Sequence, residues 1–340
     1  MTRRRGFVTG GTWCLDRNRT IDRWPAEDSV GVASGLEGRG GGSACNLAID
    51  IRRLDPSVPV ATIGLVGDDA AGRALIAEAD AAGIDRRRMH VTADAPTHVT
   101  DAFVSTESGL RTHITDMGCA ALLSPDHFEF AASEARFFHL GLPGIHELLD
   151  APQPEDANGW VTVLKAARAA SLETNLELCT VSPERLRELV TPCLPHLDTL
   201  IVNDSEIGAL AGMETVRDGA TDRDACIAAA RDVLARGTMR LAVVHYPSGA
   251  IAVDRDGNAT VVPSAAIPPE AIAGPNGAGD AFAAGFLYGI HEDWPLADCL
   301  WMGHATSACS LRAAGTTDGV ADWQTCLRLA EGWGRRTEAA

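Results

Sequence analysis

The sequence predicts an α/β fold in which helices flank a mainly parallel central sheet, and three observations support this. Short runs rich in Val, Ile and Leu alternate with longer segments of helical periodicity, which is typical of βαβ units. Of the 340 residues, 46% are hydrophobic, enough for a sizeable core. The apolar runs end in or near Gly, Pro, Asn or Asp. In such sheets ligands bind beyond the carboxyl ends of the strands, and we expect the chemistry there.

The elements follow from periodicity. We expect strands at residues 58–66, 136–142, 171–178, 199–203, 241–246 and 250–253. Helices are expected at residues 43–54, 70–82, 222–235 and 296–311. In the first helix the apolar positions follow the i, i+3, i+4 spacing of a buried stripe: Ala44, Leu47, Ala48, Ile51 and Leu54.

Two segments, residues 20–38 and 98–115, break this rhythm. The second has strand-forming residues on either side of a turn at Glu107 and Ser108. Together the segments predict a small antiparallel sheet outside the main layers, which would serve as a lid. Residues 1–330 are thus expected to form one α/β domain with a β lid, and residues 331–340 a frayed tail.

Composition restricts the partners. The net charge of −17 argues against nucleic acid, which binds clustered Lys and Arg, and favours a small-molecule substrate. Nine scattered cysteines without a C-x-x-C pair indicate reduced thiols in the cytoplasm and no zinc site. No apolar run approaches the length of a membrane span, and Gly10, Gly11 and Thr12 interrupt any signal peptide.

The most informative segment is a glycine-rich turn that leads into a helix apolar on all sides, residues 274–290. Gly277, Ala278 and Gly279 have almost no side chain, so their amides at the helix N-terminus can bind an anion. We call these three residues the anion loop. Asp280 follows it and is expected to stay ionised and to accept a proton from a hydroxyl group that faces the anion. The alternative is that Asp280 only caps the helix.

Two common nucleotide motifs are absent from this turn. No Lys followed by Ser or Thr comes after the last glycine, so it is not a Walker A loop. The G-x-G-x-x-G spacing of a dinucleotide site is also missing, which disfavours a dehydrogenase.

Residues 276–286, Asn-Gly-Ala-Gly-Asp-Ala-Phe-Ala-Ala-Gly-Phe, resemble the C-terminal signature of the ribokinase (PfkB) family of carbohydrate kinases. Residues 40–48, Gly-Gly-Gly-Ser-Ala-Cys-Asn-Leu-Ala, are similar to the family's N-terminal signature, and residues 61–72 follow at the usual distance. The similarity extends from about Gly10 to Gly319. It implies a ribokinase-like three-layer sandwich with a small β lid.

The resemblance also implies roles for individual residues. Asp16, Gly42 and Asn46 would hold the sugar, and acceptor carboxylates and amides suit sugar hydroxyls. The alternatives are a loop acid for Asp16 and a polar residue in the first turn of a helix for Asn46. Arg111 in the lid would meet an anionic substrate or the transferred phosphate, although an exposed strand cation is the more common case.

Nucleotide and metal contacts are implied as well. Asn203 and Glu206 resemble an Asn-x-x-Glu element that helps hold Mg²⁺ and phosphate; from the residues alone, Glu206 is a helix-capping acid. Asn276 would lie near the phosphates and Gly249 in the nucleotide loop. His304 aligns with a position near the adenine, against the alternative of a packed core histidine.

The implied activity is ATP-dependent in-line phosphoryl transfer to a hydroxyl of a small sugar or sugar-like substrate, with Asp280 as the base. At two places the sequence departs from the family pattern, and these departures affect the expected cation and phosphate donor. Gly274, Pro275 and Asn276 replace the usual Asp-Thr-Thr, which does not favour activation by a monovalent cation. Residues 245–249, His-Tyr-Pro-Ser-Gly, replace the usual nucleotide loop, so another phosphate donor stays open.

Two alternative functions stay open. One is a nucleoside kinase on the same fold, which would need aromatic residues to stack the base, in a chain that is only 5% aromatic. The other is a catalytically weak sugar-binding or regulatory protein. Family analogy also suggests a homodimer formed through the lid.

Overall fold

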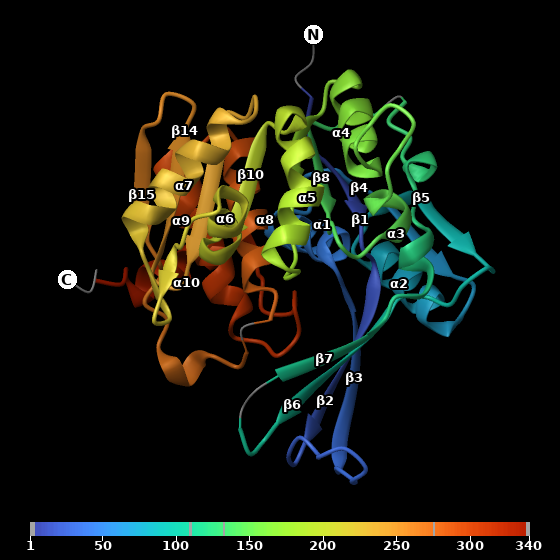
Figure 1. Cartoon of the computed structure of the whole chain (residues 1–340). Helices are drawn as coiled ribbons and strands as arrows, with labels where there is room; N and C mark the ends of the chain where they lie inside the picture. The colour runs from blue at the N-terminus through green and yellow to red at the C-terminus, as the bar shows by residue number, and fades with distance from the viewer. Residues whose placement is uncertain (1–3, 109–110, 132, 275, 338–340) are drawn as a thin grey trace.

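The chain folds around one large sheet (Figure 1). The computed structural model describes residues 4–108, 111–131, 133–274 and 276–337, and at position 111 only the backbone. Within these residues nine strands form the sheet in the order β15-β14-β13-β10-β9-β8-β1-β4-β5. The strands from β13 to β5 run parallel, and β14 and β15 are antiparallel additions at one edge. The bounds are β1 Phe7–Gly11, β4 Val60–Gly67, β5 Asp85–Thr92, β8 Phe137–Gly141, β9 Glu173–Leu176, β10 Thr199–Asn203, β13 Leu241–Tyr246, β14 Gly249–Asp254 and β15 Ala259–Pro263.

Helices cover both faces of the sheet, and each set packs into its own apolar cluster. One face carries α1 Ser43–Leu54, α2 Ala70–Ala81, α8 Ala278–His291, α9 Leu296–Ser310 and α10 Trp323–Trp333. The other carries α3 Glu147–Asp150, α4 Gly159–Ala169, α5 Pro183–Val190, α6 Asp204–Ala211 and α7 Arg223–Ala235. The predicted three-layer α/β fold is confirmed. Across the described residues, no helix is both long enough and apolar enough to cross a membrane.

Several buried elements lie where periodicity placed them, but the central strand β1, the helix α4 and the edge strands β5 and β15 were not predicted. The strands at 199–203 and 241–246 and the helix at 43–54 have the predicted bounds. Strand β5 carries Arg86, Arg87 and Arg88, because an edge strand leaves side chains in water and lacks a continuous apolar run.

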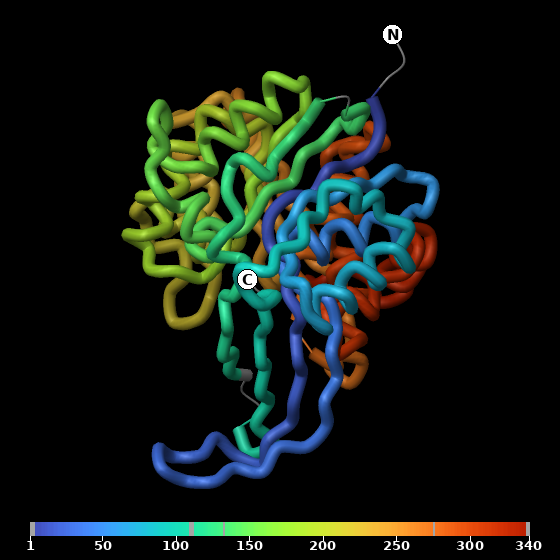
Figure 2. Tube along the Cα trace, turned by 90° about the vertical axis from the view of Figure 1, so that its right-hand side faces the viewer, coloured from blue at the N-terminus to red at the C-terminus, as the bar shows by residue number. Residues whose placement is uncertain are grey.

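A second sheet projects from the main body and forms the lid (Figure 2). Its order is β3-β2-β6-β7, with β2 Cys14–Ile21, β3 Ala33–Gly41, β6 Val99–Ser105 and β7 Arg111–Asp116. The expected antiparallel sheet is in fact mixed, because β2 and β6 are parallel, with Leu15 opposite Val99. The lid also starts earlier than residue 20, since β2 follows β1 after only Thr12 and Trp13. Asp16 therefore lies on a lid strand.

The C-terminal segment is paired beyond the expected start of the frayed tail. Helix α10 continues to Trp333. The Ala266 amide donates to the Gly334 carbonyl at 2.9 Å, and the Arg336 amide to the Ser264 carbonyl at 2.8 Å. The Arg335 guanidinium lies 4.4 Å from the ring centre of Trp301. These contacts hold the chain as far as Arg336, and residues 338–340 lie outside the described range.

Candidate active site

The candidate active site lies at the carboxyl edge of the parallel strands. Helices α1 and α8 begin at this edge and pack against each other. In an open α/β sheet the carboxyl edge is where ligands bind. Both helices begin at a glycine with positive φ: Gly42 at 89° and Gly277 at 72°.

Only glycine suits the start of α8. At Gly277 an added Cβ would lie 2.4 Å from the carbonyl oxygen of Thr316 and would also meet a left-handed backbone. Among the described residues, no side chain caps this helix N-terminus. The amides of the first turn are therefore available to an anion, as the sequence predicted for the anion loop.

Asp280 lies in that first turn, which α1 packs against. Asn46 of α1 and Glu177, which follows β9, are near enough to influence the pKa of its carboxyl group. Although part of Asp280 reaches solvent, the surrounding protein and the Glu177 charge raise the pKa of its carboxyl well above the usual range. This shift runs against the expectation that Asp280 stays ionised, because burial and a second carboxyl group oppose the effect of the helix N-terminus.

Glu177 was not predicted as a site residue. Its Oε2 lies 2.9 Å from Nε2 of His139 on β8, and Nδ1 of His139 lies 2.8 Å from the amide of Asn175. Burial and the nearby Glu206 raise the pKa of Glu177 to about 7. A sequence signal existed: Glu177 lies in the predicted strand 171–178, close to the carboxyl end where ligands bind.

The residues predicted for the sugar lie around the start of α1. Gly42 precedes the helix, and a Cβ there would lie 2.7 Å from the Thr12 carbonyl oxygen. The Asp16 carboxylate lies against Gly41, where a Cβ would come within 2.2 Å of its Oδ2. Asn46 is buried and its Oδ1 has no hydrogen-bond partner in the described structure. Its helix α1 packs on α8, which carries Asp280. Arg111 begins β7, and its side chain lies outside the described residues.

A cavity of about 570 Å³ adjoins the anion loop, and we call it the donor cavity. Four predicted residues line it: Asn203, Ala278, Gly279 and His304. His304 is buried, and its Nε2 lies 3.2 Å from the Val262 carbonyl oxygen, so it packs in the core and also borders the cavity. Burial lowers its pKa to about 3, which keeps the imidazole neutral.

Among the lining residues of the donor cavity that were not predicted, His245 and Arg336 can donate hydrogen bonds. His245 lies against Gly279, where an added Cβ would be 3.3 Å from its Cε1. Its ring centre lies 5.1 Å from that of Phe282. Arg336 reaches the cavity from the paired C-terminal segment. His245 lies in residues 245–249, whose sequence departs from the nucleotide loop of the family. That departure was the sequence signal that could have pointed to His245.

Three residues that were predicted for the nucleotide or the metal lie outside the lining of this cavity. Asn276 is in the turn before the anion loop. Gly249 begins β14 and packs against Tyr246, where a Cβ would lie 3.0 Å from the hydroxyl oxygen. Glu206 forms a capping box with Asn203: its Oε2 accepts from the Asn203 amide at 2.9 Å, and its own amide donates to Oδ1 of Asn203 at 2.8 Å. The capping interpretation of Glu206 therefore holds in the structure, beside any metal role.

The carboxyl edge of the sheet can hold Mg²⁺ only if a bound nucleotide supplies some of the oxygen ligands. Within the described chain, no group of three or more His, Cys, Asp or Glu side chains is arranged to hold a metal ion. The capping box engages Oε2 of Glu206 and leaves Oε1 for a metal-bound water. Mg²⁺ keeps several waters and binds few carboxylates when phosphates supply the other oxygens. The single carboxylate of Glu206 is therefore compatible with a Mg²⁺ ion that is bound mainly by phosphates and waters.

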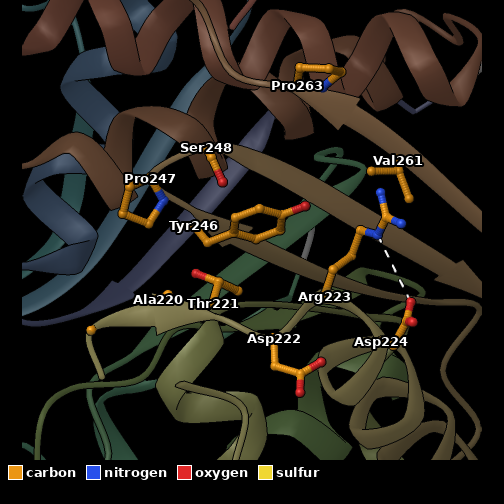
Figure 3. A pocket seen from close by; sticks show the side chains of 11 residues that line it. Ala220, Thr221, Asp222, Arg223, Asp224, Tyr246, Pro247, Ser248, Val261 and Pro263 are labelled. Carbon is orange, nitrogen blue, oxygen red and sulfur yellow. Dashed lines mark ion pairs between the residues drawn. The ribbon is translucent and has the colours of Figure 1, made fainter. Parts of the chain in front are cut away.

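A second pocket, of about 680 Å³, opens beside the donor cavity and shares Tyr246 and Pro247 with it (Figure 3). Its other walls come from the hairpin of β11 Val216–Arg217 and β12 Ala220–Thr221, the start of α7, and β15. In Figure 3 Arg223 turns to Asp224, with which it pairs at 3.9 Å. No predicted site residue lines this pocket within the described chain, so the candidate chemistry belongs to the neighbouring cavity.

Comparison with known proteins decides the family. The profile of the pfkB family carbohydrate kinases matches residues 10–323. The chain belongs to this family. It is 24% identical to adenosine kinase of Schizosaccharomyces pombe over 287 residues, which cover 82% of this chain and 81% of the relative.

Solved structures of the family share the fold. Arabidopsis thaliana ribokinase, complexed with ribose and ATP, superposes with a TM-score of 0.78 at 20% identity, covering 96% of this chain and 99% of that one. The nucleoside kinase of Methanocaldococcus jannaschii gives 0.74 at 18% identity, covering 97% and 99%. This PfkB protein is thus a carbohydrate or nucleoside kinase, as the sequence predicted.

Proposed function

We propose that this PfkB kinase transfers the γ-phosphoryl group of ATP to a hydroxyl of a small sugar or sugar-like substrate, with Asp280 as the base. One observation carries the proposal. Asp280 lies in the first turn of α8, which packs on α1 with Asn46 on the substrate side, and it directly follows the anion loop, two of whose residues line the donor cavity. A hydroxyl held by Asn46 and Asp16 would thus face a phosphate held by the loop amides.

In the proposed reaction the substrate hydroxyl gives its proton to the Asp280 carboxylate as its oxygen bonds to the γ-phosphorus. The bond between that phosphorus and the β–γ bridging oxygen breaks, and ADP leaves. The anion-loop amides stabilise charge on the transferred group. Mg²⁺, associated with Glu206 through water, would neutralise phosphate charge. Closure of the lid would exclude water, which otherwise competes as the acceptor.

The substrate side favours a polyhydroxy ring. Asp16, Asn46 and Asp280 offer mainly acceptor oxygens, which suit several hydroxyl donors at once. A nucleoside presents the same hydroxyls on its ribose. It is the second candidate, because the S. pombe relative is an adenosine kinase and the lid carries Trp24 against Phe103, with ring centres 6.0 Å apart.

The test is ADP release with a panel of sugars, sugar acids and nucleosides, for wild type, Asp280→Ala and the control Asp298→Ala. Asp298 occupies the first turn of the neighbouring helix α9 and is exposed. We expect Asp280→Ala to lower kcat by about 10²-fold or more, the scale of general-base catalysis. The control should keep wild-type turnover. Equal kcat in the wild type and Asp280→Ala would refute the role of the base.

The remaining parts of the proposal concern conditions and assembly. We place the enzyme in the cytoplasm, because none of its nine cysteines is paired in the described structure and all but Cys179 are buried. The altered residues 274–276 argue against potassium activation.

We also propose a homodimer formed through the lid, whose exposed apolar side chains include Val30, Val32 and Leu36.

A further inference from the structure

The C-terminal segment forms part of the wall of the donor cavity. After helix α10 the Arg336 amide donates to the Ser264 carbonyl at 2.8 Å, and Ala265 and Arg335 form an antiparallel bridge. Of these residues Ser264, Ala265 and Arg336 line the cavity. The guanidinium of Arg335 packs on Trp301 instead, 4.4 Å from its ring centre. The segment thus anchors one arginine on helix α9 and places the next one at the donor cavity.

The charge of Arg336 distinguishes it from the other residues of the donor cavity. Among the described lining residues it is the only Lys or Arg, and Asp204 is the only Asp or Glu. Burial lowers the pKa of His245 to about 4 and that of His304 to about 3, so both lining histidines are neutral at physiological pH. In a chain with a net charge of −17, Arg336 therefore supplies the full positive charge among these lining residues.

Part of the cavity wall beside Arg336 is apolar. Ala265, Ile267 and Ala308 belong to one core cluster, Leu311 packs against it, and all four line the cavity. The anion loop lines the cavity as well, and its amides suit phosphates. The lining thus combines a surface for phosphates with a surface for a flat, weakly polar group.

A nucleotide base is such a group, and proteins stack bases on aromatic rings or on the plane of an Arg guanidinium. Tyr246 is the only Phe, Trp or Tyr among the described residues that line the donor cavity. Arg336 is exposed, so its side chain is free to lie over a base whose other face rests on the apolar wall. The guanidinium can therefore do what an aromatic ring does in other base-binding sites.

We infer that Arg336 is a specificity-determining residue which stacks its guanidinium on the base of the nucleotide donor. This rests on the proposed function, in which ATP occupies the donor cavity. The anion-loop amides hold the phosphates, and the C-terminal segment holds the base through Arg336. The contact selects a nucleotide over a phosphate donor that has no base.

The first test is calorimetric titration of ADP into the wild type, Arg336→Met and Arg336→Lys. Methionine keeps the length of the side chain without the charge, and lysine keeps the charge without the planar group. We expect Arg336→Met to raise the Kd for ADP about fivefold, the scale of a partly exposed stacking contact. Arg336→Lys should weaken binding nearly as much, because the plane is lost. Recovery of wild-type affinity in Arg336→Lys would overturn the stacking contact.

The matched control is Arg328→Met. Arg328 is exposed on α10, outside the lining of the donor cavity, and its guanidinium donates to Thr325 Oγ1 at 2.8 Å. This variant removes the same charge from a neighbouring position and should bind ADP with wild-type affinity. A loss equal to that of Arg336→Met would show an effect of net charge alone and would reject the contact.

Inorganic tripolyphosphate separates the base from the phosphates. Its inhibition constant against ATP, measured at about 0.15 M salt to screen distant charges, should be the same in the wild type and Arg336→Met. A fivefold rise for tripolyphosphate, matching that for ADP, would move the contact to the phosphates and overturn the inference.

The inference and the proposed function fail in different ways. Equal ADP affinity of the wild type and Arg336→Met would overturn the inference and leave ATP as the donor. A wild-type enzyme that does not bind ADP would reject the nucleotide donor, and the role of Arg336 with it.

Discussion

At the scale of single residues, His245 is placed to act on the phosphate donor. Its imidazole borders the donor cavity beside Gly279, and among the described residues it has no hydrogen-bond partner. Burial lowers its pKa to about 4, so it is neutral at physiological pH and has one N–H to donate. We propose that its acceptor is a phosphate oxygen bound by the anion-loop amides.

We therefore expect His245→Phe to raise the KM for ATP about tenfold, the scale of one hydrogen bond to a charged group. Phenylalanine keeps a ring to pack on Phe282 and loses the donor. His245→Asn, which keeps an N–H donor, should recover part of the effect. Steady-state kinetics with varied ATP measures this, and an unchanged KM in His245→Phe would exclude the contact.

Asp50 is a buried acid with no counterpart in the proposed mechanism. It lies on α1, is fully buried, and neither carboxyl oxygen has a hydrogen-bond partner in the described structure. Burial and the nearby Asp280 raise its pKa well above the usual range. The folded state therefore holds a proton that the unfolded chain loses above its ordinary pKa, and stability falls as pH rises through this window.

Asp50→Asn should thus stabilise the protein more at pH 8 than at pH 5, by a difference of about 1 kcal/mol or more. Urea unfolding at the two pH values measures it, with the exposed Asp298→Asn as the control. An equal effect of Asp50→Asn at both pH values would show that this carboxyl group titrates normally.

At the scale of secondary-structure elements, the start of α6 combines two roles in Glu206. The capping box with Asn203 stabilises the helix end, and burial raises the pKa of the same carboxyl group. Sequence reasoning left capping and metal association as alternatives. The geometry allows both, because the cap uses only Oε2.

Substitutions can distinguish the capping role of Glu206 from its role in metal association. Glu206→Gln keeps the capping box and loses the charge, so its unfolding free energy should stay near wild type while the KM for MgATP rises several-fold. Glu206→Ala should show the same kinetic defect and also lose about 1 kcal/mol of stability. Chemical unfolding and kinetics with varied Mg²⁺ measure these effects. Wild-type kinetics in Glu206→Gln would leave the residue as a helix cap only.

At the scale of the whole molecule, the lid extends away from the main body (Figure 2). It also exposes apolar side chains. Val30 is 84% exposed, Val32 66% and Leu36 61%, and Ile114 on the outer strand β7 is also exposed. A projecting sheet with uncovered apolar residues is a site for pairing with another chain. The proposed occupant is the lid of a second copy.

We expect light scattering coupled to size-exclusion chromatography to give the mass of a dimer for the wild type and of a monomer for Leu36→Asp. The monomer should bind its substrate more weakly, because Asp16 lies on the same lid. Arg87→Asp, on the exposed edge strand β5, is the control and should stay dimeric. A monomeric wild type at micromolar concentration would rule out this assembly.

The fold and the anion loop were predictable because their physics is local or periodic. Buried strands such as β10 and β13 are continuous apolar runs, and α1 has one apolar stripe. Gly277, Ala278, Gly279 and Asp280 are adjacent in sequence, so the turn and its acid are read together. The polar edge strand β5, the parallel pairing of β2 and β6, and the pairing of Arg336 with Ser264 all depend on distant neighbours.

The sequence by itself determined the α/β architecture, the family and the position of the candidate base. Only the tertiary structure decided the surroundings that shift the pKa of that base, because Glu177, His139 and Asn46 come from three other parts of the chain that the fold brings near the start of α8. A carboxyl pKa depends on the charge and solvent within a few ångströms. Those surroundings arise from the packing of residues far apart in the chain.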